Sequence, residues 1–239
     1  VETVHRPQKT SADGWPQRDR LETEEYAGAC SPVSTEMDRQ DGIDLIDKVV
    51  DINNLFNACK KVKANKGAPG VDEMTVDELF GHVAKYRTEL IRTLKNGSYE
   101  PLPVKRVEIP KLDGSMRKLG IPCVRDRMVQ QAIYQVIGKI IDPHFSERSY
   151  GFRPKRNQHQ AIKQSITCYE QGYRVVVDCD LKSYFDTINH QKLMEYLKEF
   201  INDKIVLKLI WKFLKSGILE GGLISPTEEG APQGGVLSP

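Results

Sequence analysis

Apolar residues recur at helical spacing in the first part of the chain, after a polar start. From Ile43 to Val62 they return every three or four positions, which predicts a helix. Residues 76–94 repeat the pattern, and Asn96–Gly97 is a typical helix end. Residues 1–40 have no apolar period and contain scattered Pro, Gly, Ser and Glu, so we expect a flexible or loosely docked extension.

Strand-like alternation begins at Pro103–Pro110, and Lys111–Pro122 carries the hairpin turn signal Asp113–Gly114. The remaining apolar periods predict further helices over 124–141, before Gly172, and over 193–200 and 205–214, with a strand pair over 217–227. Helices that alternate with strands around one hairpin indicate an α/β or α+β layered domain.

Composition narrows the classes of protein. The 239 residues are 39% hydrophobic and 28% charged, which suits one large or two small globular domains. A net charge of +2 says little about partners. Five cysteines without a CxxC pair argue against a disulfide framework or zinc site and favour a reducing, cytoplasmic setting. No apolar run is long enough to span a membrane, and the ends at Val1 and Pro239 suggest a fragment or processed form.

The run Val175–His190 carries the strongest chemical signal. Three valines precede Asp178 and Asp180, and a buried strand would direct both carboxylates to the same side. Carboxylates at the end of a buried strand often hold divalent metal for phosphoryl chemistry. The alternative is that Asp180 or Asp186 caps a helix turn.

Five segments in this order resemble one family. The chain from roughly Gly42 to Pro239 is similar to the reverse transcriptases of bacterial group II introns, the maturase family. The segments that carry the resemblance are NKGAPGVD (65–72), KLDGSMRKLGIP (111–122), SYGFRPKRN (149–157), DCDLKSYFDTINH (178–190) and PQGGVLSP (232–239).

The resemblance implies an α+β fold, the fingers and incomplete palm of a right-hand polymerase. After the extension over 1–40, it implies an N-terminal helical block of the fingers over 41–95, fingers over 96–172 and a partial palm over 173–239. Members copy RNA into DNA and help their intron RNA to fold and splice. The family's next block, with two further catalytic aspartates, would follow Pro239, so we expect this chain to bind RNA but not to polymerise alone.

The resemblance also assigns roles to the site residues. Asp180, chosen over Asp178 by its spacing to Phe185, would bind two Mg²⁺ ions together with the carbonyl of Leu181. Phe185 would exclude a 2′ hydroxyl from the incoming nucleotide; the alternative is a core aromatic. The remaining nucleotide-binding candidates are Lys111 and Arg117 of the hairpin, which grip the triphosphate, and Gln233 and Gly234. Without the resemblance, we would interpret the hairpin as a solvated charged surface and the PQGG segment as a turn.

Two basic groups are the candidates for RNA contact, since clustered Lys and Arg suit phosphates. The first surrounds the NKGAPG loop and comprises Lys60, Lys61, Lys63, Asn65, Lys66, Gly67, Pro69 and Gly70. The second comprises Arg148, Arg153, Lys155 and Arg156. Such clusters otherwise form only a soluble face.

The expected partners are intron RNA, an RNA template with a DNA primer, and dNTP. We expect the protein to act in the bacterial cytoplasm, without contact to a membrane. A homodimer is possible. Two other functions stay open as well. One is a non-catalytic RNA-binding and splicing module, and the other is a retron, diversity-generating or CRISPR-associated reverse transcriptase. The segments NKGAPGVD and SYGFRP favour the group II type.

Overall fold

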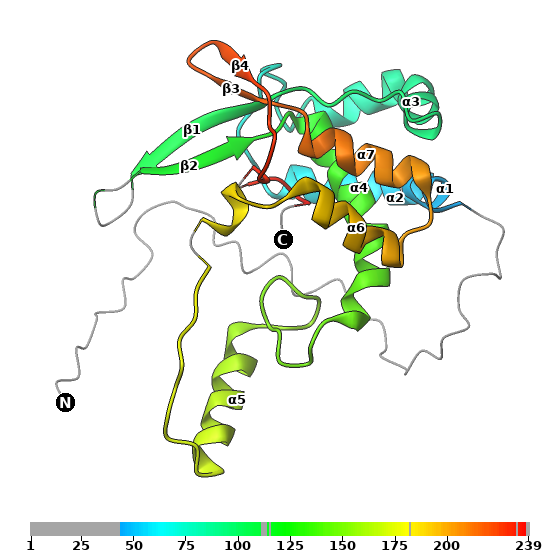
Figure 1. Cartoon of the computed structure of the whole chain (residues 1–239). Coiled ribbons are helices and arrows are strands. Elements are labelled where there is room, and N and C mark those ends of the chain that lie inside the picture. The colour runs from blue at the N-terminus through cyan, green and yellow to red at the C-terminus, as the bar shows by residue number, and fades with distance from the viewer. Residues whose placement is uncertain (1–43, 111–113, 115, 182, 233, 238–239) are drawn as a thin grey trace. The chain divides into compact units, whose positions relative to one another are not determined.

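The computed structural model describes residues 44–110, 114, 116–181, 183–232 and 234–237 (Figure 1). Contacts divide the chain into two compact units, which are described separately. The smaller unit contains Glu147–Tyr173, and the larger contains the described residues up to Ser146 and from Arg174 onward.

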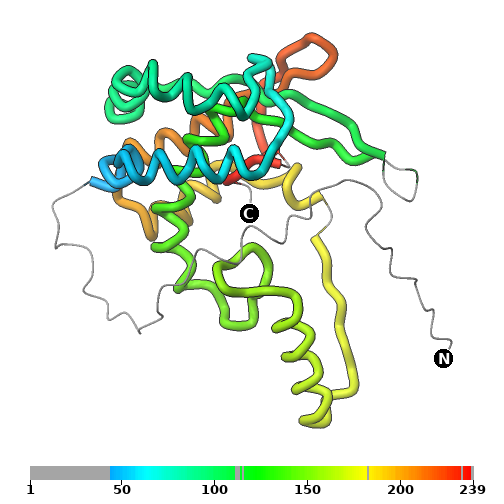
Figure 2. The backbone as a smooth tube through the Cα atoms, turned by 180° about the vertical axis from the view of Figure 1, so that it is seen from behind, coloured from blue at the N-terminus to red at the C-terminus, as the bar shows by residue number. Residues whose placement is uncertain are grey.

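Helices form the core of the larger unit. They are α1 (Leu45–Val50), α2 (Ile52–Ala64), α3 (Leu79–Lys95), α4 (Val124–Ile141), α6 (His190–Phe200) and α7 (Lys204–Leu214), with a short 3₁₀ turn, η2 (Asp142–His144). Helix α4 is buried along most of its length and lies beside α2 (Figure 2). The side chains of Leu55, Val129 and Leu209 are almost completely buried in this core, so packing of apolar helix faces holds the unit together.

The helix predicted from Ile43 to Val62 is broken in two. Asp51 leaves the helical region, with φ −53° and ψ 139°, and its carboxylate accepts hydrogen bonds from the N–H groups of Asn53 and Asn54. Asp51 therefore caps the start of α2, which is why one apolar period yields two helices.

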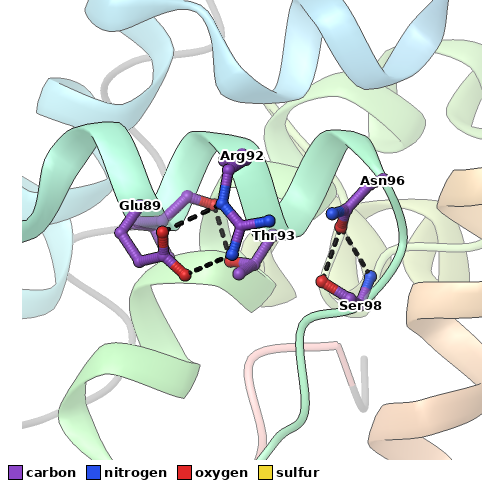
Figure 3. Close-up of polar contacts among 6 residues, drawn as sticks. Glu89, Arg92, Thr93, Asn96 and Ser98 are labelled. Atoms are coloured by element: carbon purple, nitrogen blue, oxygen red, sulfur yellow. Dashed lines mark hydrogen bonds and ion pairs between the residues drawn. The ribbon is translucent and has the colours of Figure 1, made fainter.

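The end of α3 matches the signal at Asn96–Gly97. Gly97 adopts φ +66°, and the side chain of Asn96 accepts hydrogen bonds from the N–H and hydroxyl of Ser98 (Figure 3). One turn earlier, Arg92 grips Glu89 through two hydrogen bonds, which lowers the pKa of that carboxyl. The contacts of Asn96 and Gly97 end the helix and turn the chain toward β1, whereas the Glu89–Arg92 pair lies within the helix.

The sheet of the larger unit has four strands in the order β2-β1-β3-β4. They are β1 (Val104–Pro110), β2 (Met116–Ile121), β3 (Ile218–Glu220) and β4 (Leu223–Ser225). The β1–β2 and β3–β4 pairs are antiparallel, and β3 joins β1 in parallel. The predicted hairpin and the later strand pair are therefore both confirmed.

The smaller unit consists of the basic loop and helix α5 (Gln158–Glu170). Asn157 and Gln160 form a reciprocal capping box at its start. The predicted loop-to-helix order is confirmed, although no residue of α5 is buried. Across the described residues of both units, every helix is too short or too polar to cross a bilayer.

Candidate functional site

The carboxylate segment does not form the predicted buried strand. Residues 174–181 have no regular secondary structure, and the side chains of Val175, Val176 and Val177 are 85%, 91% and 81% exposed. A strand needs neighbouring N–H and C=O groups, and the described sheet contains no strand from this segment. The expectation that a strand aligns Asp178 with Asp180 is therefore wrong for this chain; both carboxylates and Leu181 are exposed.

The segment turns sharply at Ser183. Ser183 adopts the left-handed region at φ 54°, and the 3₁₀ turn η3 (Tyr184–Asp186) follows. The ring of Tyr184 packs edge-on against that of Phe185, with centroids 5.5 Å apart. Phe185 is half-buried, so it is neither fully exposed nor a residue of the helical core.

The residues before the PQGG segment close onto this turn. Ala231 N–H donates to the carbonyl of Phe185 at 2.7 Å, and Gly230 N–H donates to that of Ile188 at 2.8 Å. The ring Nε2 of His190 lies 2.6 Å from the carbonyl of Gly230. Gly230 has φ +81°, and a Cβ there would lie 2.7 Å from the carbonyl oxygen of Asp186, so only glycine fits without strain.

The PQGG segment also packs against the hairpin. A Cβ on Gly234 would lie 2.7 Å from the carbonyl oxygen of Gly120 in β2, and φ there is +110°. Val236 N–H donates to the side chain of Gln130 in α4 at 3.0 Å. The structure therefore gathers η3, the PQGG segment, β2 and α4, although Gln233 itself lies outside the described residues.

The hairpin presents Arg117 on its exposed surface. Arg117 pairs with Ile109 near the tip, where Pro110 pairs with Met116. Lys111 lies outside the described residues. Register therefore places Arg117 on β2, the strand against which Gly234 packs.

The NKGAPG loop packs against the start of α4, a contact that the sequence pattern did not predict. Arg127 is 9% exposed, and its guanidinium donates to the carbonyl of Ala68 at 2.7 Å. Burial lowers the pKa of Arg127, and its Nε has no hydrogen-bond partner among the described residues. A Cβ on Gly70 would lie 2.6 Å from Cα of Cys123. The sequence signal for this contact is Arg127 itself, a charged residue within the apolar pattern of a buried helix.

The basic residues around this loop lie on the last turns of α2 and in the loop itself, most of them at the surface of the larger unit. Lys60, Lys63, Asn65 and Lys66 are exposed, and Lys61, Gly67 and Pro69 are half-buried. Lys63 pairs with Asp77 at 3.2 Å, and Lys60 lies over the ring of Phe56 at 4.8 Å from its centroid. Lys66 adopts φ 47°, which lifts it out of the α2 helix.

The second basic group lies in the smaller unit. Arg148 and Lys155 are exposed, whereas Arg153 and Arg156 are half-buried. Arg156 donates to the carbonyl of Glu147 at 3.0 Å and lies over the ring of Tyr150. Part of this group therefore supports the loop that presents it.

A second buried group missed by the sequence analysis fixes the hairpin to α4. The carboxylate of Asp126 accepts hydrogen bonds from the hydroxyl of Tyr99 and from the N–H of Leu102. Burial raises the pKa of Asp126, and these two hydrogen bonds oppose the rise. Because Leu102 lies just before β1, the contact sets where the hairpin leaves the helical core.

The chain is similar to known proteins both in sequence and in fold. The family described as "Reverse transcriptase (RNA-dependent DNA polymerase)" matches residues 109–239. Protein YkfC of Escherichia coli (strain K12) is 42% identical over 191 residues, which are 77% of this chain and 50% of that protein. Group II intron-encoded protein LtrA of Lactococcus lactis subsp. cremoris is 39% identical over 187 residues, 77% of this chain and 31% of that protein.

A solved structure shares the fold. It is described as a partial Cas6-RT-Cas1–Cas2 complex and aligns with a TM-score of 0.55 and 22% identity, over 82% of this chain and 33% of that one. The chain spans half or less of the length of the two curated relatives described above.

Proposed function

Because the chain belongs to the reverse transcriptase (RNA-dependent DNA polymerase) family, we propose that the whole protein is the RNA-directed DNA polymerase of a group II intron. As a maturase it also binds its intron RNA for splicing and mobility. The similarity to a group II intron-encoded protein supports this type over other reverse transcriptases.

The observation that carries the proposal is the contact between three distant segments. The hydrogen bond from Ala231 to Phe185 and the packing of Gly234 on β2 bring η3, the PQGG segment and the hairpin together. Each segment supplies a proposed contact to an incoming nucleotide. Phe185 stacks below the sugar and excludes a 2′ hydroxyl, the glycines line the pocket, and Arg117 with Lys111 grips the triphosphate.

Reverse transcriptases generally use Mg²⁺. Within the described part of the chain, no three His, Cys, Asp or Glu side chains gather to hold a metal ion. Asp180 and the carbonyl of Leu181 can supply only some of the ligands of a Mg²⁺ site, because hard cations need several oxygen ligands. We therefore assign Asp180 as one carboxylate of a two-Mg²⁺ site and derive no catalytic step through the metal.

The domain division proposed from the resemblance follows the same logic. Residues 41–95 form the N-terminal block of the fingers, 96–172 the remaining fingers and 173–239 the first part of the palm. By itself this chain binds RNA and does not polymerise, because Asp180 alone does not supply all the carboxylates that a two-Mg²⁺ site needs.

A salt titration of RNA binding tests the proposal beside primer extension with Mg²⁺. Replacing Lys60 and Lys66 by alanine lowers affinity and flattens the dependence on log[salt] by about 0.7–0.9 per lost phosphate contact. Lys85 and Arg87, exposed on α3 outside both basic groups, provide the matched control. Binding that ignores salt, or robust DNA synthesis by this chain alone, contradicts the proposal.

A further inference from the structure

An open groove of about 480 Å³ is lined by residues of α6 and α7, and none of the residues assigned to nucleotide binding lines it. Figure 1 shows the backbone of these two helices, away from the β1–β2 hairpin. Its lining positions recur at i, i+3, i+4 and i+7 on both helices. The floor is apolar and consists of Met194, Leu207 and the half-buried Trp211. Two parallel helical rows over an apolar floor suit an amphipathic segment laid along them.

The rim of the groove is basic. Lys198, Lys204 and Lys208 line it and are exposed, and Glu195 is the one acidic residue among the lining positions. None of the three lysines forms an ion pair with another residue that the structure describes. The groove therefore matches an occupant that is acidic and carries an apolar anchor.

The chain enters the described region beside one end of this groove. The N–H of Ile46 in α1 donates to the carboxylate of Asp203 at 2.8 Å. Asp203 caps α7, so it directly precedes the lining residue Lys204. The first described residues of the chain are thus fixed next to the basic rim.

The residues just before α1 have the complementary composition. Residues 33–41, VSTEMDRQD, contain three acidic residues and one basic residue, with Val33 and Met37 four positions apart. Asp44 lies seven positions after Met37, and this stretch spans up to about 25 Å when extended. The lined part of α7, from Lys204 to Trp211, is only about 10 Å long at 1.5 Å per residue.

From these observations we infer that residues 33–41 dock in the α6–α7 groove of their own chain. Met37 fills the apolar floor, and Glu36, Asp38 and Asp41 face the lysines of the rim. The short tether keeps the segment at high effective concentration, so weak contacts suffice. The inference is independent of the polymerase proposal, because none of these residues has a role in that site.

Photo-cross-linking in the full chain tests the inference. Benzoylphenylalanine at Met37 should link within one chain to peptides of α6 or α7, and the same probe at Thr23, between two other acidic residues, should not. The triple change K198E/K204E/K208E should cut the yield about tenfold, since three weak attractions become repulsions. Links only between chains assign the groove to a second copy and overturn the inference, as do links elsewhere or none.

Trp211 provides a second readout without a cross-linker. The chain has two tryptophans, so Trp15→Phe leaves Trp211 alone. In that background E36K/D38K/D41K should increase quenching of Trp211 by acrylamide, a neutral quencher that ignores the added charge. The control E22K/E24K/E25K, with equal charge reversal further along the chain, should not. Equal quenching in the two triple variants overturns the inference, and circular dichroism verifies that both remain folded.

Discussion

Ala231, which directly precedes the PQGG segment, and Phe185 of the carboxylate segment are joined by a backbone hydrogen bond of 2.7 Å. The neighbouring bond from Gly230 to Ile188 makes the contact a two-bond clamp. The clamp fixes the proposed sugar-sensing ring against the segment that leads to Gly234. Disturbing the clamp should therefore affect the geometry of both motifs.

Gly230→Ala should destabilise the protein by roughly 1–3 kcal/mol through a strained φ and a clash with the carbonyl of Asp186. Gly222→Ala is the matched control, because Gly222 also has a positive φ, +85°, but no neighbouring atom within 4 Å of a Cβ. Urea unfolding compares the two. Equal losses would show that backbone strain alone matters and that the clamp contributes nothing.

Local pattern predicted most of the fold. The hairpin follows from alternation around Asp113–Gly114, and α4 follows from its apolar period, because in both cases nearby residues supply the pairing or the packing. The break at Asp51 was missed, since its side-chain cap competes with an unbroken period.

Distant partners explain what the sequence did not predict. Val175–Val177 read as a buried strand, but burial needs a neighbouring strand that no local pattern reveals. The support of Ala68 by Arg127 likewise joins two elements far apart in the sequence. The structure brings η3 close to the residues that precede the PQGG segment, whereas the roles that the resemblance implies for the individual residues stay predictions.

Phe185→Val should let the full-length enzyme accept ribonucleotides, because the ring is proposed to fill the space of a 2′ hydroxyl. Phe185→Tyr keeps the bulk and should retain discrimination. The measurement is the ratio of kcat/KM for dNTP and rNTP. An unchanged ratio in folded Phe185→Val protein means that the half-buried ring serves packing only.

Arg117→Ala should raise the KM for dNTP, since a charge-assisted contact to the triphosphate contributes roughly 1.5–3 kcal/mol. Primer–template affinity should change much less. Lys118→Ala is the control, because successive residues of β2 point to opposite faces. Loss of template affinity with an unchanged KM for dNTP would contradict the assignment of Arg117 to the triphosphate.

Thiol alkylation tests the exposure of the carboxylate segment. Burial raises the pKa of Cys59 and of Cys123 to about 11, so roughly one thousandth of each is thiolate at pH 8. Cys179, exposed between Asp178 and Asp180, should react with iodoacetamide far faster. Peptide mass spectrometry over time measures the three rates. If Cys179 reacts as slowly as Cys59 and Cys123, the carboxylate segment is not exposed in this chain.

Asp180 is proposed to be a metal carboxylate of an RNA-directed DNA polymerase. Primer extension on an RNA template by the full-length protein tests it most directly, with Asp180→Asn beside Asp178→Asn and RNA affinity measured in parallel. We expect Asp180→Asn to abolish DNA synthesis with RNA affinity nearly intact and Asp178→Asn to retain synthesis, because losing a metal ligand removes transition-state stabilisation rather than template contact. Synthesis by Asp180→Asn within a few-fold of the unmodified protein would contradict the claim and assign the carboxylate to Asp178.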